Sequence, residues 1–196
     1  MKKFFYFFII CIFSSSTSIA SDYYVGIDFS QIEVNTGVTN ISSTLDEDDT
    51  SIKFTYGYNV DSKLSFETFY IDFGEASLSG NAGSQFSYQG DTYQFNQSAT
   101  ISLSADSFGF GGRYKINDQG ESHAYLLGGL HRYDVKIGVS SASASSNISD
   151  SGVEPYFGIG YNYSLTNDIK FNAAYQNYQF EDSDISGLVL GIQFNY

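Results

Sequence analysis

The sequence contains almost no cysteine, proline or tryptophan. Its single cysteine, Cys11, lies in the N-terminal apolar stretch, so the rest of the chain cannot form a disulfide of its own. There is one proline, Pro155, and there is no tryptophan. No segment after the N-terminal stretch approaches about 18 consecutive apolar residues, which excludes a membrane-spanning helix.

Positive charge is also scarce. The chain has 9 Lys and Arg residues against 22 Asp and Glu residues. Leaving out Lys2 and Lys3, which belong to a predicted signal peptide, reduces the basic residues to seven and gives a formal charge of −15. Phosphates would be repelled by such a chain, so nucleic acid is excluded as a partner.

The first twenty residues have the layout of a secretory signal peptide. Lys2 and Lys3 precede the apolar run 4–13, and Ser18-Ile19-Ala20 supplies small residues for cleavage after Ala20. The apolar run is too short for a membrane anchor, which needs about 20 residues. We therefore expect residues 1–20 to be a signal peptide and residues 21–196 to form one exported domain.

Aromatic residues and two-residue alternation dominate the rest of the chain. Aromatics make up 18% of the sequence, with 17 Tyr and 18 Phe. Apolar residues recur at every second position, which is typical of strands with two different faces. The expected strands cover residues 23–30, 50–58, 63–74, 99–116, 123–137, 154–163, 169–176 and 187–196.

Short and long connections alternate between these eight strands. The short ones are 59–63, 117–122 and 164–168, and the longer ones are 35–49, 74–98, 138–151 and 181–185. This order predicts an all-β fold, an eight-stranded antiparallel up-and-down barrel with short turns at one rim and loops at the other. The serine-rich segment 140–152 is expected to be a flexible surface loop.

Side-chain size indicates which face points outward. One face of the strands collects Phe, Tyr, Ile and Leu, and the other collects small and polar residues. The interior of an eight-stranded barrel is just wide enough for side chains, so bulky aromatics on every strand would overfill it. The facing of 123–137 stays open, because both registers carry apolar residues. The charged residues expected in the interior are Asp28, Lys53, Glu67, Arg113 and Lys170.

An outward aromatic face predicts a transmembrane barrel. Water tolerates contiguous apolar patches of only a few hundred Å², whereas lipid suits such a surface. A Lys or Arg facing the bilayer midplane would cost about 2–4 kcal/mol, and these strands keep their cations on the other face. Tyrosines near the strand ends are expected to form interfacial girdles: Tyr58, Tyr70, Tyr114, Tyr163, Tyr175 and Tyr196.

The mature chain resembles the OmpA-like and opacity-type family of small outer-membrane barrels. The resemblance is carried by YYVGIDFS, KLSFETFYIDFG, DSFGFGGRYKI, PYFGIGYNYSLTNDIKFNAAYQNY and the ending GIQFNY. It implies export to the bacterial outer membrane, with lipid and lipopolysaccharide as surroundings. It also implies that Ile192, Phe194 and Tyr196 are the signal read by the barrel-assembly machinery.

No catalytic set stands out. Outer-membrane lipid A deacylases place a serine two positions after the catalytic histidine, but here Tyr125 follows His123 and Tyr133 follows His131 at that spacing. We therefore expect neither an enzyme nor a cofactor. The acidic runs 46–49 and 181–184 favour solvated loops, so no metal site is assigned. A second hypothesis is that they bridge cations to lipopolysaccharide phosphates.

These observations favour a structural, surface-exposed barrel whose loops meet host or surface ligands. The alternative is a narrow channel or carrier for small apolar molecules, which would show single-channel conductance. A lipid-modifying enzyme and a soluble lipocalin-like binder are further alternatives. The enzyme would lose activity on His131→Ala, and the binder would stay in solution without detergent.

Overall fold

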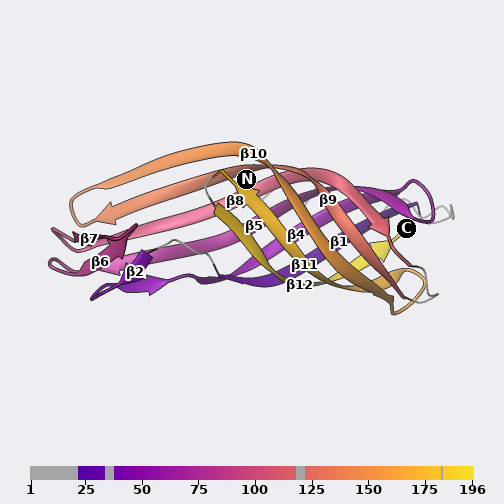
Figure 1. Cartoon of the computed structure of the whole chain (residues 1–196), viewed down its shortest axis with the longest axis horizontal. Helices are drawn as coiled ribbons and strands as arrows, with labels where there is room; N and C mark the ends of the chain where they lie inside the picture. The colour runs from indigo at the N-terminus through magenta and orange to yellow at the C-terminus, as the bar shows by residue number, and fades with distance from the viewer. Residues whose placement is uncertain (1–21, 34–37, 118–121, 182) are drawn as a thin grey trace.

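The computed structural model describes residues 22–33, 38–117, 122–181 and 183–196. The predicted signal peptide, residues 1–20, lies outside them. In this part of the chain no helix is long and apolar enough to cross a membrane. The elements are strands (Figure 1): β1 (Tyr23–Glu33), β2 (Val38–Asn40), β3 (Thr44–Asp46), β4 (Asp48–Asn59), β5 (Leu64–Gly80), β6 (Gln85–Tyr88), β7 (Asp91–Gln94), β8 (Ala99–Lys115), β9 (Ser122–Ser141), β10 (Ser145–Ser164), β11 (Ile169–Phe180) and β12 (Ser183–Asn195).

Eight long antiparallel strands close into a barrel, which confirms the predicted fold. Their order is β5-β4-β1-β12-β11-β10-β9-β8, and β5 pairs with β8 to complete the circle. The last strand lies against the first, with Phe194 opposite Val25. Closure leaves no free sheet edge around the barrel wall, as a lipid environment requires of any spanning sheet.

The turns at one rim are short, as predicted. Residues 60–63 join β4 to β5, and the Asp61 carboxylate accepts hydrogen bonds from the backbone N–H groups of Lys63 and Leu64 at 2.7 and 2.8 Å. Residues 165–168 join β10 to β11. Part of the third turn, 118–121, lies outside the described residues.

The opposite rim differs from the prediction. The segment 140–152 is not a loop, because β9 runs to Ser141 and β10 starts at Ser145, joined by a hydrogen bond from Ser141 N to Ala144 O of 2.9 Å. Ile137, Val139 and Ile148 continue the two-residue alternation through this serine-rich stretch, which explains the extension. The connection predicted at 181–185 is also shorter, since β11 ends at Phe180 and β12 begins at Ser183.

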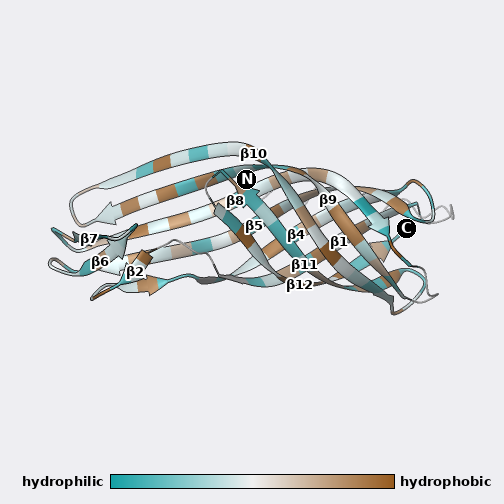
Figure 2. Ribbon diagram, in the orientation of Figure 1, coloured by the Kyte–Doolittle hydropathy of each residue, from teal (hydrophilic) through white to brown (hydrophobic). Residues whose placement is uncertain are grey.

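The two faces of the strands separate as predicted, and Figure 2 shows the resulting alternation of hydropathy along the ribbons. Phe54 and Tyr56 point outward and are 42% and 44% exposed, whereas Lys53, which directly precedes Phe54, is 2% exposed. The register left open for 123–137 is now settled: Leu126 and Leu130 face outward. The six tyrosines expected in the girdles are all exposed on the outer surface: Tyr58, Tyr70, Tyr114, Tyr163, Tyr175 and Tyr196.

The interior also holds large aromatic rings, which corrects the expectation of a small, polar filling. Phe69, Phe73, Tyr125, Tyr156 and Tyr178 are all buried inside the wall. Inward-facing glycines make room for such rings. A Cβ added at Gly109 would lie 2.2 Å from the Phe69 ring, and one at Gly160 would lie 2.3 Å from the Tyr125 ring. Large and small residues thus interdigitate across the barrel.

Candidate functional site

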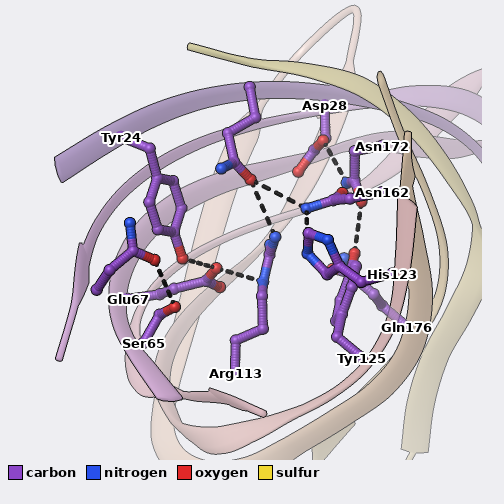
Figure 3. Close-up of polar contacts among 12 residues, drawn as sticks. Tyr24, Asp28, Ser65, Glu67, Arg113, His123, Tyr125, Asn162, Asn172 and Gln176 are labelled. Carbon is purple, nitrogen blue, oxygen red and sulfur yellow. Dashed lines mark hydrogen bonds and ion pairs between the residues drawn. The ribbon is translucent and has the colours of Figure 1, made fainter. Parts of the chain in front are cut away.

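A network of polar side chains fills part of the barrel interior, and Figure 3 shows Tyr24, Glu67, Arg113 and Tyr125 among its members. Hydrogen bonds and ion pairs link members from all eight barrel strands. The members arise from alternation, because each strand points every second residue inward. The best-connected members are Tyr24 and Asp28 of β1, Lys53 of β4, Glu67 of β5, Arg113 of β8, Tyr125 of β9, Asn162 of β10, Asn172 and Gln176 of β11 and Gln193 of β12.

Glu67 and Arg113 form an ion pair inside the barrel. Arg113 Nε lies 2.6 Å from Glu67 Oε1, and the two side chains are 6% and 1% exposed. The Tyr24 hydroxyl donates a hydrogen bond to the same carboxylate. Arg113 Nη1 donates to Gln193 Oε1 at 3.1 Å, and its guanidinium carbon lies 4.1 Å from the centroid of the Tyr125 ring. Both charges are therefore surrounded by partners that compensate for lost water.

Asp28 belongs to a second branch of the network. Its Oδ1 accepts a hydrogen bond of 2.8 Å from Asn172 Nδ2. The amide oxygen of Asn172 in turn accepts one of 2.5 Å from the Tyr125 hydroxyl. Because the Tyr125 ring also faces the Arg113 guanidinium, the two branches meet at this side chain.

Lys53 reaches toward the aromatic part of the interior. Its ammonium donates to Gln176 Oε1 at 3.0 Å and lies 4.4 Å from the centroid of the Phe69 ring. The Tyr178 hydroxyl donates to the same amide oxygen at 2.6 Å. A cation over an aromatic face is attracted by the ring's quadrupole, which adds to the hydrogen bond in holding this buried charge.

Lys170 is less buried than the other four predicted charges. It pairs in register with Gln193 at the start of β11, near the short-turn rim, and it is only half-buried. Of the predicted assembly signal, Ile192 and Phe194 are each 42% exposed on the outer surface of β12, and Tyr196, the residue after this strand, is 43% exposed.

The sequence did not point to a second interior contact, between Ser107 of β8 and His131 of β9. The Ser107 hydroxyl lies 2.8 Å from His131 Nδ1, and His131 Nε2 lies 2.8 Å from the carbonyl oxygen of Gln179. A carbonyl only accepts, so Nε2 carries the proton and donates it. His131 is 1% exposed among aromatic rings. No local sequence motif indicates this pair, because its two residues are 24 positions apart and come together only when the strands pair.

One cavity inside the barrel is small. The cavity beside Phe73 and Tyr178 has a volume of about 10 Å³, which is about the size of one water molecule. A wider hollow of about 420 Å³ opens at the far end of the molecule. It is lined by uncharged residues that are mostly small, among them Ser79, Asn81 and Thr100. The interior network is thus suited to filling and bracing the barrel.

Known proteins share this architecture. The structure of Ail, the attachment invasion locus protein of Yersinia pestis, matches with 17% identity and a TM-score of 0.55, over 91% of this chain and 100% of that one. Ail has also been solved with the heparin analogue sucrose octasulfate. The N-terminal barrel of Pseudomonas aeruginosa OprF matches with 12% identity and a TM-score of 0.56, over 90% and 98%. Neisserial surface protein A matches with 16% identity and a TM-score of 0.54, again over 90% and 98%.

Comparison with family models agrees with the fold. No curated protein matches the sequence. The model of the OmpA-like transmembrane domain matches residues 18–184, most of the described barrel. The chain therefore belongs to the OmpA-like transmembrane domain family and is a β-barrel of the bacterial outer membrane.

Proposed function

We propose that the protein is a structural, non-enzymatic barrel that presents its outer loops and strand extensions to ligands outside the cell. The observation that carries this proposal is the filled interior. Arg113, Tyr125 and Lys53 lie across the lumen, each held by partners from other strands. A solute would have to displace several hydrogen bonds and rings to pass, so the barrel serves as a platform.

Planar-bilayer recording tests this proposal against the alternative of a narrow channel. We expect the purified, refolded protein to insert into the bilayer without unitary current steps. Insertion is checked in the same sample by SDS electrophoresis, where a folded barrel migrates differently before and after boiling. Reproducible single-channel steps from inserted protein would contradict the proposed platform and support the narrow channel.

The position of the histidines supports a non-enzymatic role. A lipid-modifying enzyme must reach acyl chains outside the wall, but His123 and His131 are 6% and 1% exposed and point inward. Both nitrogens of His131 are already engaged, by Ser107 and by the carbonyl of Gln179. We expect purified protein mixed with lipopolysaccharide to release no fatty acid. Release that disappears in His131→Ala would contradict this proposal.

The acidity of the chain bears on the ligands of the outer surface. Ail has been solved with a polyanion, sucrose octasulfate. The present chain carries 22 acidic against 9 basic residues, so repulsion disfavours polyanions and attraction favours cationic partners. Two members of the acidic runs already serve as hydrogen-bond acceptors: Asp49 for Glu75 N at 2.8 Å and Asp184 for Asn177 Nδ2 at 2.6 Å.

The end of β12 supports recognition by the barrel-assembly machinery. Ile192, Phe194 and Tyr196 form an outward apolar row on the strand that closes the barrel. We expect Phe194→Ser to reduce the folded barrel recovered from cell membranes, yet to leave refolding from urea into lipid vesicles nearly unchanged. Phe54→Ser, which removes an aromatic of the same exposure, 42%, from β4, is the matched control. Equal losses in the two variants would point to stability instead of recognition.

A further inference from the structure

One strand of the barrel has a long free edge beyond the membrane-spanning part. β10 pairs with β9 from Ser145 to Tyr163, but with β11 only from Tyr156 to Ser164. Residues 145–155 therefore have a neighbour on one side, and no described strand covers the other. Figure 1 shows β9 and β10 continuing well past the ends of β11 and β12. β10 is 20 residues long, whereas about 9–11 suffice to span a membrane.

The backbone groups along this edge can be assigned. Ser141 N donates to Ala144 O, and the register continues from there without a bulge. In an antiparallel ladder, alternate residues direct both backbone groups to the same neighbour. Ser146 and Ile148 thus face β9, and the groups pointing away from β9 belong to Ser145, Asn147, Ser149, Ser151 and Val153. Pro155 falls in the same series, where its missing N–H costs no ladder bond.

We define the projecting sheet as residues 75–80 of β5, 99–105 of β8, 133–141 of β9 and 145–155 of β10. Its inner face is apolar across β5, β8 and most of β9, and carries carboxylates only on β10. Register places Ala76, Leu103, Ile137 and Ile148 in one row across the four strands. Toward β5 this face is covered, since Phe95 is 7% exposed and its ring lies over Gly80. Toward the free edge it is open, and Ile148 is 65% exposed.

The charge along the edge has one sign. Residues 145–155 include Asp150 and Glu154 and no basic residue. Both carboxylates share the inner face with Ile148, because they are an even number of positions from it. The Asp150 carboxylate also accepts a hydrogen bond of 2.8 Å from Ser151 N, one of the outward N–H groups. A basic side chain beside Asp150 would compete for that carboxylate and release the N–H.

We propose that this edge binds an extended segment of a partner protein by strand addition. The segment places an apolar side chain beside Ile148 and basic side chains beside Asp150 and Glu154, with neutral polar residues on the opposite face. Main-chain hydrogen bonds supply affinity in this mode, and alternate side chains supply specificity. The inference rests on the proposed function, because the edge must project outside the cell.

A second copy of the chain fits the edge less well. Copies in one membrane have the same orientation, so their β10 strands run in the same direction and pair only as parallel strands, which bond less strongly per residue. Two edges would also bring four carboxylates together without a cation.

The test uses the protein in nanodiscs of phosphatidylcholine, with a nine-residue peptide that alternates threonine with valine and lysine. Its twin carries glutamate in place of lysine. We expect the cationic peptide to slow amide hydrogen exchange at Ser145, Asn147 and Ser149. Ser149→Pro removes one outward N–H without breaking the β9 ladder, and should weaken binding by about tenfold, whereas Ser149→Ala should not. Asp150→Lys should weaken binding of the cationic peptide and strengthen binding of its glutamate-containing twin.

Four results would overturn the proposal: unchanged exchange at the outward amides, equal binding by Ser149→Pro, equal binding of the two peptides, or outward amides already protected by self-association before peptide is added. The heat-dependent shift on electrophoresis and the bilayer recording are measured on the same preparation. An inserted, non-conducting barrel that ignores the peptide would refute strand addition alone, and failure to insert would refute the proposed function.

Discussion

Glu67 and Arg113 show how single residues shape the inside of this barrel. Both are nearly inaccessible to water, and each is held by the other and by neutral partners such as Tyr24 and Gln193. Burying two charges is costly, so such a pair is chiefly sensitive to the loss of one member. The remaining charge would then be left without its counter-ion.

Glu67→Gln should lower the free energy of unfolding by about 3 kcal/mol, because Arg113 stays charged and buried. Urea titration of the barrel in lipid vesicles, followed by the heat-dependent electrophoretic shift, measures the change. Glu75→Gln is the control, since Glu75 is exposed on the same strand and should change stability by less than about 0.5 kcal/mol. Equal changes in the free energy of unfolding for Glu67→Gln and Glu75→Gln would mean that the ion pair does not stabilise the barrel.

Asp61 gives the short-turn rim a measurable pH dependence. Hydrogen bonds from Lys63 N and Leu64 N lower the pKa of its carboxyl below the usual 3.8. A lowered folded-state pKa stabilises the turn above the unfolded pKa, and this contribution is lost as pH falls through the folded value. We expect the amides of Lys63 and Leu64 to remain protected at pH 4 and to lose protection below it.

Asp61→Asn serves as the control for this titration, because its amide oxygen accepts the same bonds but does not ionise. Its amide protection should be independent of pH over the range where the wild-type turn loosens. Loss of protection at the same pH in both proteins would show that another group is responsible.

At the scale of elements, β5 changes its facing within one strand. Phe69, Ile71 and Phe73 point inward at odd positions, whereas Ala76 and Leu78 point inward at even ones. A bulge between Asp72 and Glu75 produces the switch, with Gly74 at φ 79° and Glu75 N bound to Asp49. The bulge keeps the apolar face of the projecting sheet on the inner side.

Gly74→Ala should therefore destabilise the projecting part of β5. The left-handed conformation costs a residue with a Cβ about 1–2 kcal/mol, and the added carbon would lie 2.5 Å from Asp49 Oδ2. Amide exchange from Ala76 to Gly80 should quicken while the barrel core stays protected. Gly112→Ala is the control, because the nearest atom to its added Cβ is Ser65 O at an ordinary 3.8 Å. Unchanged exchange in Gly74→Ala would argue against this role of the bulge.

The elements also show what the sequence could and could not reveal. Alternation such as Ile52, Phe54 and Tyr56 against Lys53 is local, so the strands and their outward face were predictable. The strand extension through 140–152 was missed because serine-rich composition hid a sparse alternation of Ile and Val. The aromatic interior was missed because its rings fit only beside glycines of neighbouring strands, such as Phe69 beside Gly109. Such pairs are separated widely in sequence and depend on register.

At the scale of the whole molecule, the two faces of the barrel wall meet different surroundings. The aromatic outer face lies against hydrocarbon, and the inner face encloses a packed polar and aromatic filling. The family match and the closed strand order agree with this assignment. It implies that residues one position apart on a strand experience different surroundings.

Fluorescent labels attached to single cysteines test this directly, in lipid vesicles that contain a spin-labelled acyl chain and in protein produced without residues 1–20, so that Cys11 is not labelled. Labels at Phe54 and Phe171, on the outer face of β4 and β11, should be quenched strongly by the lipid and weakly by a water-soluble quencher. A label at Tyr93, exposed on β7 beyond the barrel, should show the reverse. Labels at Phe54 and Phe171 that respond to the aqueous quencher and not to the lipid would contradict the account.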